Sequence, residues 1–346
     1  MKRNFSKQIS IIFLIMLMAI FGVTLTVSAD QSEPELNPIT MTWVAGGVGG
    51  GWYTQAGGLA QLINENEPKI TIKVVPGGGL VNPVRVSTHQ DDLGWGITFV
   101  DKAAFDGQAP LYEEPYPDVR AIGAIFGIYN IHFVAAKNQG IETIEELMQM
   151  VKEGKAIKVA APMKGTSDLP IIETIFDFYG ISLDDVEKAG GKVFHAVYAD
   201  MVSLYQDHHV DFVCTHLSIP AAAVTEMTVG RDSIILAASE ELIDYCHEEL
   251  GTVARESGLC VIPANTYKGQ EKDVPVVVTA GELLVNKDVP DEVVYTILKI
   301  FDENIEQVYQ IDRTNRYFIP EDGWKNVAVP LHSGAEKYYK EKGYMP

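Results

Sequence analysis

Cysteine is scarce in this chain of 346 residues. It occurs three times, at Cys214, Cys246 and Cys260, and never as a Cys-x-x-Cys pair. This excludes the common cysteine-ligated zinc sites and thioredoxin-like redox motifs. In an oxidising compartment one disulfide would leave one thiol over, and the sequence leaves the pairing open. Cys214 lies in an apolar run, which predicts a buried and unreactive thiol.

Basic residues are also few. The chain has 27 Lys and Arg against 47 Asp and Glu, a formal net charge of −20. Such an acidic surface disfavours nucleic acid and anionic membrane surfaces as partners. A small anionic ligand stays compatible with this charge, because backbone dipoles act locally on a bound ion.

Motifs of catalysis and of nucleotide binding are missing. Gly-x-Ser-x-Gly, the nucleophile elbow of α/β-hydrolases, does not occur. The glycine run at 46–51 fits neither a dinucleotide fingerprint nor a P-loop, and no lysine follows it. His208 and His209 are adjacent, whereas ligands on a helix are spaced three or four residues apart. We therefore predict no enzyme activity, no cofactor and no metal site.

Long apolar runs are absent except at the N-terminus. Lys2 and Arg3 precede the nearly uninterrupted apolar stretch Ile9–Leu25, and Val27–Ala29 matches a small-residue cleavage site. This pattern predicts a signal peptide, residues 1–29, cleaved after Ala29, with export across the inner membrane to the periplasm. An uncleaved membrane anchor is the alternative, since the run approaches the length of a span.

Strands and helices alternate through most of the remaining chain. The pattern begins with strand, helix, strand, short helix and strand, which is typical of a doubly wound α/β lobe. Asn82 is expected to cap the short helix, with Pro83 at its first position. These five elements are expected at 39–46, 53–66, 69–79, 82–90 and 92–99.

A second alternating series follows and includes a helix from 143 in which Thr143 and Glu146 match a capping box. The last third contains two strands and a long amphipathic helix over 290–310. Two such series predict an α/β fold of two lobes, a type II clamshell of the kind found in periplasmic binding proteins, each lobe a sheet flanked by helices. The expected boundaries are 30–130 with 251–346 for lobe I, and 131–250 for lobe II.

Three strand-to-helix turns would line the cleft of such a fold. They are Gly46–Tyr53, Pro76–Asn82 and Pro162–Asp168. Glycine exposes main-chain N–H groups, and a helix N-terminus adds a positive dipole end, so each turn suits an anionic or polar ligand. A fourth turn, Thr215–Pro220, also ends a strand before a helix. Ligands of α/β folds bind at such strand ends.

The third turn adds side-chain chemistry. Thr166 and Ser167 offer hydroxyl groups, and Lys164 offers a cation for a carboxylate. For Lys164 an equally good interpretation is a solvated surface lysine. For His216 it is an ordinary capping or buried polar residue. The full set of predicted ligand contacts is Gly51, Trp52, Tyr53, Gly78, Gly79, Asn82, Thr98, Lys164, Gly165, Thr166, Ser167, His216 and Ser218.

These motifs are similar to those of one family. The segments concerned are "GGGWYTQAGGLAQLI" at 49–63, "GGGLVN" at 77–82, Asp92-Leu93-Gly94, "KGTS" at 164–167 and "VPLHSGAEKYYKEKG" at 329–343. In these segments the chain resembles the TAXI family of extracytoplasmic solute receptors, the binding subunits of TRAP transporters. The likeness covers nearly all of the chain after residue 29.

The resemblance implies a two-lobed receptor that delivers its ligand to TRAP transporter membrane subunits. It also implies a small organic acid or amino-acid ligand, glutamate-like or 2-oxoglutarate-like. Trp52 and Gly79 depart from the family pattern and would alter the pocket. A binding protein of an ABC-type transporter, a ligand-binding sensor and an enzyme on the same fold remain the alternatives.

Overall fold

One mixed sheet runs through the protein, whose computed structural model describes residues 36–47, 51–164 and 166–346. The predicted signal peptide lies outside the described residues. The strand order is β2-β1-β3-β11-β4-β7-β5-β6, with β8 also paired to β4 and a separate pair β9-β10. The strands are β1 (Ile39–Val44), β2 (Ile70–Val75), β3 (Leu93–Ile97), β4 (Val119–Ala136), β5 (Lys158–Pro162), β6 (Lys192–Ala196), β7 (Phe212–Leu217), β8 (Ser233–Ile235), β9 (Val261–Ile262), β10 (Val274–Pro275) and β11 (Val278–Asn286).

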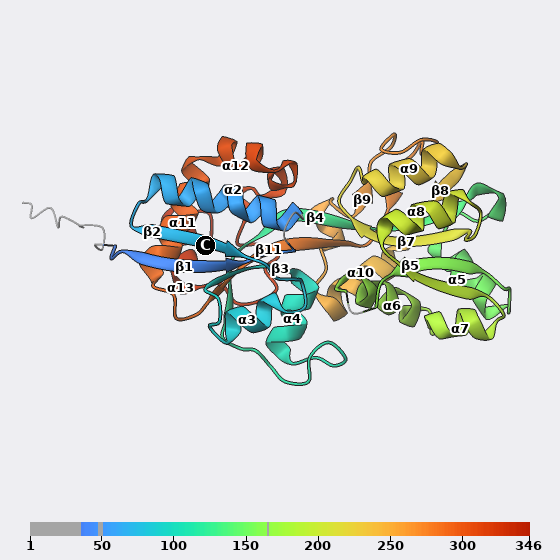
Figure 1. Cartoon of the computed structure of the whole chain (residues 1–346), viewed down its shortest axis with the longest axis horizontal. Helices are drawn as coiled ribbons and strands as arrows, with labels where there is room; N and C mark the ends of the chain where they lie inside the picture. Colours follow the sequence, from blue (N-terminus) through green and yellow to red (C-terminus); the bar gives the residue numbers. More distant parts are fainter. Residues whose placement is uncertain (1–35, 48–50, 165) are drawn as a thin grey trace, which may run out of the picture. The chain divides into compact units, whose positions relative to one another are not determined.

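The first part of the sheet carries the N-terminal and C-terminal helices. Strands β1, β2 and β3 pair in parallel, and β11 joins β3 in the antiparallel sense. Trp43, Trp95 and Phe126 are buried in the core of this part. Figure 1 shows the chain's last helices (orange to red) beside α2 (blue), so the C-terminus returns to the first lobe. The helices here are α2 (Gly51–Asn66), α3 (Asn82–Ser87), α4 (Thr98–Asp106), α11 (Asp291–Glu303), α12 (Ile305–Ile311) and α13 (Ser333–Glu341), with the 3₁₀ turns η3 (Arg313–Tyr317) and η4 (Pro320–Asp322).

The second part of the sheet is built from β5, β6, β7, β8 and the end of β4. Its first α-helix, α5, begins as predicted, because Thr143 and Glu146 form a capping box. Apolar residues such as Phe133, Phe176 and Tyr205 fill its core. The helices are α5 (Ile144–Lys152), α6 (Asp168–Phe178), α7 (Leu183–Lys188), α8 (Tyr198–Gln206), α9 (Ala222–Gly230) and α10 (Glu240–Leu250), with η1 (Lys137–Gln139) and η2 (Arg255–Ser257).

Strand β4 belongs to both parts. It is 18 residues long. Its first stretch pairs with β11, and its last residues pair with β7. Asn130 is the crossing point, since it lies opposite both Val278 of β11 and Leu217 of β7. Figure 1 shows β4 and β11 together between the two lobes. Any hinge between the lobes must therefore act on these two strands.

Part of the region 251–277, expected in lobe I, also contacts elements of lobe II. Ala238 N–H donates to Pro275 O (2.8 Å), and within the region Val276 N–H donates to Cys260 O (3.1 Å). Tyr267 adds a hydrogen bond to His132 of β4 (2.9 Å). The start of the region lies beside α4 of lobe I, since a β-carbon on Gly251 would lie 3.2 Å from Lys102 Cδ. The lobe boundary in this region therefore stays a prediction.

Some local predictions needed revision. The predicted third strand ends at Ile97, and α4 begins at Thr98. The predicted long helix is interrupted at Asn304, whose side-chain N–H donates to Ile300 O (2.8 Å) and so competes with the helical backbone. The three cysteines are buried, and none forms a disulfide. Within the described part of the chain, no helix has the length and apolar character needed to cross a membrane.

Candidate functional site

The three glycine- and hydroxyl-containing turns lie against one another. Gly77 N–H of the second turn donates to Gly46 O of the first (3.2 Å). A β-carbon placed on Gly79 of the second turn would lie 2.7 Å from Ser167 Oγ of the third. Gly79 belongs to lobe I and Ser167 precedes α6 of lobe II, so this contact joins the lobes. β1 and β2 run parallel to each other, whereas β5 in the other part of the sheet runs in the opposite sense. The carboxyl ends of the three strands therefore face one another across the interlobe region, which is why turns distant in sequence share one place.

Asn82 fixes the second turn from within. Its side-chain N–H groups donate to Ala45 O (2.8 Å) and Trp95 O (2.7 Å), and its Oδ1 accepts from Gly78 N–H (2.9 Å). The side chain is fully buried. It is the first residue of α3 rather than its cap, because Val81 takes the capping position. In this structure Asn82 and Gly78 thus shape the turn, and direct ligand contact by either stays a prediction.

His216 stands at the centre of the interlobe region. Its Nδ1 lies 3.2 Å from Asp168 Oδ1, and its Nε2 lies 2.6 Å from Thr279 Oγ1 of β11. Tyr198 OH donates to Asp168 Oδ2 (2.7 Å). Burial by itself would raise the pKa of the Asp168 carboxyl, but the His216 and Tyr198 contacts outweigh it and the pKa is lowered. Asp168 is therefore a carboxylate at neutral pH.

This hydroxyl–imidazole–carboxylate order is that of a nucleophilic triad. Thr279 is fully buried inside β11, however, and His216 is only 4% exposed. No substrate can reach the Thr279 hydroxyl in this arrangement. The group instead connects β7 and α6 of lobe II to the strand that leads back to lobe I.

Aromatic rings form the wall beside His216. The Trp52 indole N–H donates to Tyr129 OH (2.6 Å), and the Trp95 indole N–H donates to Trp52 O (3.1 Å). The rings of Tyr129 and Phe99 lie 5.7 Å and 6.3 Å from the His216 ring. Burial raises the pKa of Tyr129 to about 12, with the Trp52 hydrogen bond opposing and Asp312 and Asp168 adding to the rise. Tyr129 thus stays a neutral phenol.

The predicted residues fall into different places. Trp52, Gly79, Ser167 and His216 are brought together as described above. Gly51 begins α2 and is exposed, whereas the Tyr53 hydroxyl turns away toward Val74 O of β2 (3.5 Å). Thr166 Oγ1 donates to Met163 O (2.8 Å), within its own turn. Lys164 is exposed, Ser218 is half-buried, Thr98 is buried, and Gly165 lies outside the described residues.

Several residues of this region were not predicted from the sequence. The sequence patterns do not point to Tyr129, Tyr198 or Thr279, and Asp168 enters them only as the end of the third turn. Tyr129 and Thr279 lie in strands made mostly of apolar residues, and polar residues in buried strands are the signal that would have pointed to them. Their pairing across β4 and β11 depends on strand order.

The site is a polar interlobe region and holds no cluster of metal-ligating residues. Among described residues, no three His, Cys, Asp or Glu side chains are grouped as a metal site. What the region offers is hydrogen-bond donors, namely the Ser167 hydroxyl and the first-turn N–H groups of α2 and α6. Such donors bind and orient a small polar molecule.

Comparison with known families shows which family the chain belongs to. Its sequence matches the family model described as the NMT1-like family over residues 44–343. The chain belongs to the NMT1-like family. This match covers every strand of the NMT1-like sheet from the end of β1 onward, and it includes all the turns described above.

A solved structure with a TM-score above 0.5 supports the fold of this NMT1-like protein. A TctC solute-binding protein from Polaromonas has 16% sequence identity and a TM-score of 0.52, covering 89% of this chain and 99% of that one. MatC from Rhodopseudomonas palustris with bound malate has 14% identity, coverage of 88% and 98%, and a TM-score of 0.49. The periplasmic binding protein BugD has 16% identity, coverage of 89% and 95%, and a TM-score of 0.45. The NMT1-like chain has the mixed α/β fold of periplasmic binding proteins, a sheet flanked by helices.

Proposed function

We propose that this protein is the extracytoplasmic solute-binding subunit of a TRAP-type transporter. It captures a small organic acid, glutamate-like or 2-oxoglutarate-like, between its lobes and delivers it to the membrane subunits. The observation that carries the proposal is the contact between the second and third turns at Gly79 and Ser167. Through it, helix N-termini of both lobes meet in one place, so one ligand can bridge the lobes.

The chemistry of the region supports a carboxylate. The N-termini of α2 and α6 present positive dipole ends, and the Ser167 hydroxyl is a donor. Lys164 precedes α6 and supplies an exposed cation at the edge of the region. Asp168 repels anions, but it is engaged by His216 and Tyr198. A carboxylate would therefore bind on the turn side of Ser167, away from Asp168.

The family and the fold support a binding role over an enzyme. The likeness to a TctC solute-binding protein concerns a protein of this kind. The hydroxyl–imidazole–carboxylate group at Thr279 is buried. The TRAP-type partner rests on the resemblance of the turns and of the C-terminal segment to the TAXI family.

Ligand-dependent stabilisation tests the proposal. Protein freed of ligand by partial unfolding is screened by thermal denaturation against C4–C6 di- and tricarboxylates, amino acids, sugars and aromatic acids. A ligand at 100 times its Kd adds about 2.7 kcal/mol to the folded state, which gives a clear rise in Tm. We expect an organic acid to do so and Ser167→Ala to weaken the effect. A response to sugars or neutral aromatics alone would contradict the carboxylate.

Export is tested separately. If the N-terminal segment is a signal peptide, protein recovered from the periplasmic fraction begins at Asp30, which N-terminal sequencing detects. Recovery in the membrane fraction with Met1 retained would instead show an uncleaved anchor.

A further inference from the structure

Two carboxyl groups are enclosed together in lobe I. Asp101 of α4 and Glu282 of β11 are both 0% exposed. Gly96 of β3 lies opposite Glu282 in the ladder between β3 and β11. A β-carbon on Gly96 would overlap the carboxyl group of Asp101, so this group lies directly above the strand position beside Glu282. Only glycine at position 96 leaves room for the two carboxyl groups to meet.

The two carboxyl groups are hydrogen-bonded to each other. Glu282 Oε1 also accepts from Ala328 N–H (2.9 Å). Glu282 Oε2 and both Asp101 oxygens are buried and, among the described residues, have no other donor. Ionised carboxyl groups offer only acceptors, so a hydrogen bond between the two requires a proton on one of them. Without that proton, two negative charges would be in contact inside the fold and would repel each other strongly.

The basic side chains of α4 and of α3, which packs against it, have other partners. Lys102 of α4 pairs with Asp106 (2.7 Å). Arg85 of α3 pairs with Asp91 (2.6 Å) and donates to Pro76 O (3.1 Å). Both cations are therefore engaged away from the carboxyl pair.

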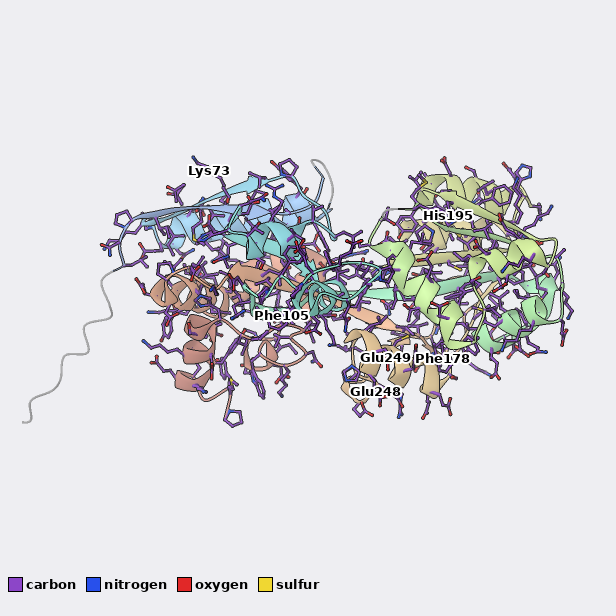
Figure 2. All side chains as sticks on the ribbon, turned by 90° about the horizontal axis from the view of Figure 1, so that it is seen from below. Lys73, Phe105, Phe178, His195, Glu248 and Glu249 are labelled. Carbon is purple, nitrogen blue, oxygen red and sulfur yellow. The ribbon has the colours of Figure 1, made fainter. Side chains whose placement is uncertain are left out.

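The other titratable groups around α4 and β11 bring no positive charge to the pair. Tyr112, in the loop after α4, is a neutral phenol, because burial and the charge of Asp101 raise its pKa. His247 of α10 is exposed, and Figure 2 labels the next two residues of that helix, Glu248 and Glu249, which are exposed and acidic. The basic side chains of β4, of the end of β11 and of the loop before Ala328 have their own partners: Arg120 with Pro117 O, Lys287 with Asp118, and Lys325 with Asp322.

The pKa values of both groups agree with a protonated pair. Burial, the charge of Glu282 and the hydrogen bond between the groups raise the pKa of Asp101 well above its ordinary range. Burial also raises the pKa of Glu282, although its hydrogen bonds with Ala328 and Asp101 oppose the rise. Both shifts favour a proton that is held inside the fold at neutral pH.

We propose that Asp101 and Glu282 share one proton in a carboxyl–carboxylate hydrogen bond, which ties α4 to β11 and is lost as the solvent becomes alkaline. The proton is taken from solvent when the chain folds. It returns to solvent, as one O–H bond breaks, when the second carboxyl group ionises. β11 also carries Thr279, the partner of His216 in lobe II, so the pair holds α4 to a strand that runs between the lobes. The pair lies in lobe I and needs no ligand between the lobes.

The direction of the pH effect follows from the two raised pKa values. In the unfolded chain both carboxyl groups have their ordinary pKa of about 4. The stability that the shared proton contributes is therefore complete below about pH 4 and is lost as the pH rises through the higher pKa of the folded pair. One extra proton on the folded chain raises the unfolding constant by up to about tenfold for each pH unit in this range.

Urea denaturation of the full chain between pH 5 and pH 9 tests the pair. Asp101→Asn and Glu282→Gln each replace one carboxyl group by an amide that donates to the other, so no proton is needed. The unfolding constant should rise with pH more steeply in wild type than in either variant, by up to about tenfold per pH unit. Asp106→Asn, on the same helix but at the surface, should behave as wild type.

Infrared spectroscopy detects the proton directly, because a protonated carboxyl group has a C=O stretching band separate from the carboxylate bands. At pH 7.5 wild type and Asp106→Asn should show such a band, and Asp101→Asn and Glu282→Gln should lack it. If these two variants do not fold, the presence or absence of the band in wild type still decides. The proposal is overturned if wild type has no protonated carboxyl band at pH 7.5, or if both folded variants keep the pH dependence of wild type.

Discussion

Gly79 and Ser167 are in contact although one belongs to the second turn of lobe I and the other to the start of α6 in lobe II. A β-carbon on Gly79 would lie 2.7 Å from Ser167 Oγ, closer than side chains normally approach. The absence of a side chain at position 79 is thus a condition for the lobes to meet as they do.

Gly79→Ala should therefore hold the lobes apart. Overpacking at such a contact costs about 1–3 kcal/mol, which the protein avoids by opening. We expect a larger radius of gyration in small-angle X-ray scattering and weaker ligand binding. Gly78→Ala is the matched control, because a β-carbon there meets no atom within 4 Å. Equal scattering curves for the two variants would contradict the role of Gly79.

Asn82→Ala should lower the free energy of unfolding. The substitution leaves Ala45 O, Trp95 O and Gly78 N–H without their side-chain partner. Three lost hydrogen bonds at about 1 kcal/mol each predict a loss of roughly 3 kcal/mol, to be measured by urea denaturation. Asn64→Ala offers a comparison, since the Asn64 side chain bonds only with Ile72 and is less buried. A loss for Asn82→Ala no larger than that control would show that the turn does not depend on it.

The bond between His216 and Thr279 should couple the two residues energetically. His216→Ala removes one hydrogen-bond partner from Thr279 and one from Asp168. Thr279→Val removes only the hydroxyl and keeps the shape of the side chain. A double-mutant cycle should give an interaction energy of about 0.5–3 kcal/mol. His209→Ala, at an exposed position, serves as the neutral control. If the effects of His216→Ala and Thr279→Val on the free energy of unfolding are additive, the proposed bridge between β7 and β11 is contradicted.

His132 should make the protein sensitive to acid. Tyr267 OH accepts from Ala221 N–H and lies 2.9 Å from His132 Nε2, while His132 Nδ1 lies 3.0 Å from Asn130 O. Both ring nitrogens are thus used by a neutral imidazole. Burial lowers the pKa of His132 to about 3; the Asn130 carbonyl opposes this fall and His216 adds to it.

The direction of the change in stability with pH follows from proton binding. Below the ordinary histidine pKa of about 6.5 the unfolded chain takes up a proton at this position and the folded chain does not. Stability is fully present above this pH and falls as the pH drops toward 3, by at most about 1.4 kcal/mol per pH unit. His132→Gln should flatten the pH dependence of Tm between 6 and 4, and His209→Gln should not. Equal slopes in wild type and His132→Gln would contradict the assignment.

The sequence by itself determined the local features of this protein. The capping box of Thr143 and Glu146, the alternation of strands and helices, and the glycine turn before α3 all follow from short-range patterns. They were predictable because a few adjacent residues supply the hydrogen bonds and backbone freedom concerned. The α/β fold of the periplasmic binding proteins followed from these elements and agrees with a solved structure.

Only the tertiary structure decided which residues meet. β11 lies between β3 and β4. That order sets Thr279 beside His216 and Glu282 beside Asp101, and no local pattern specifies it. Asn82 shows the same limit: its sequence position suggested a helix cap, but packing buried its amide among three backbone groups. Burial and strand order are properties of the assembled chain, since they depend on contacts between residues far apart in sequence.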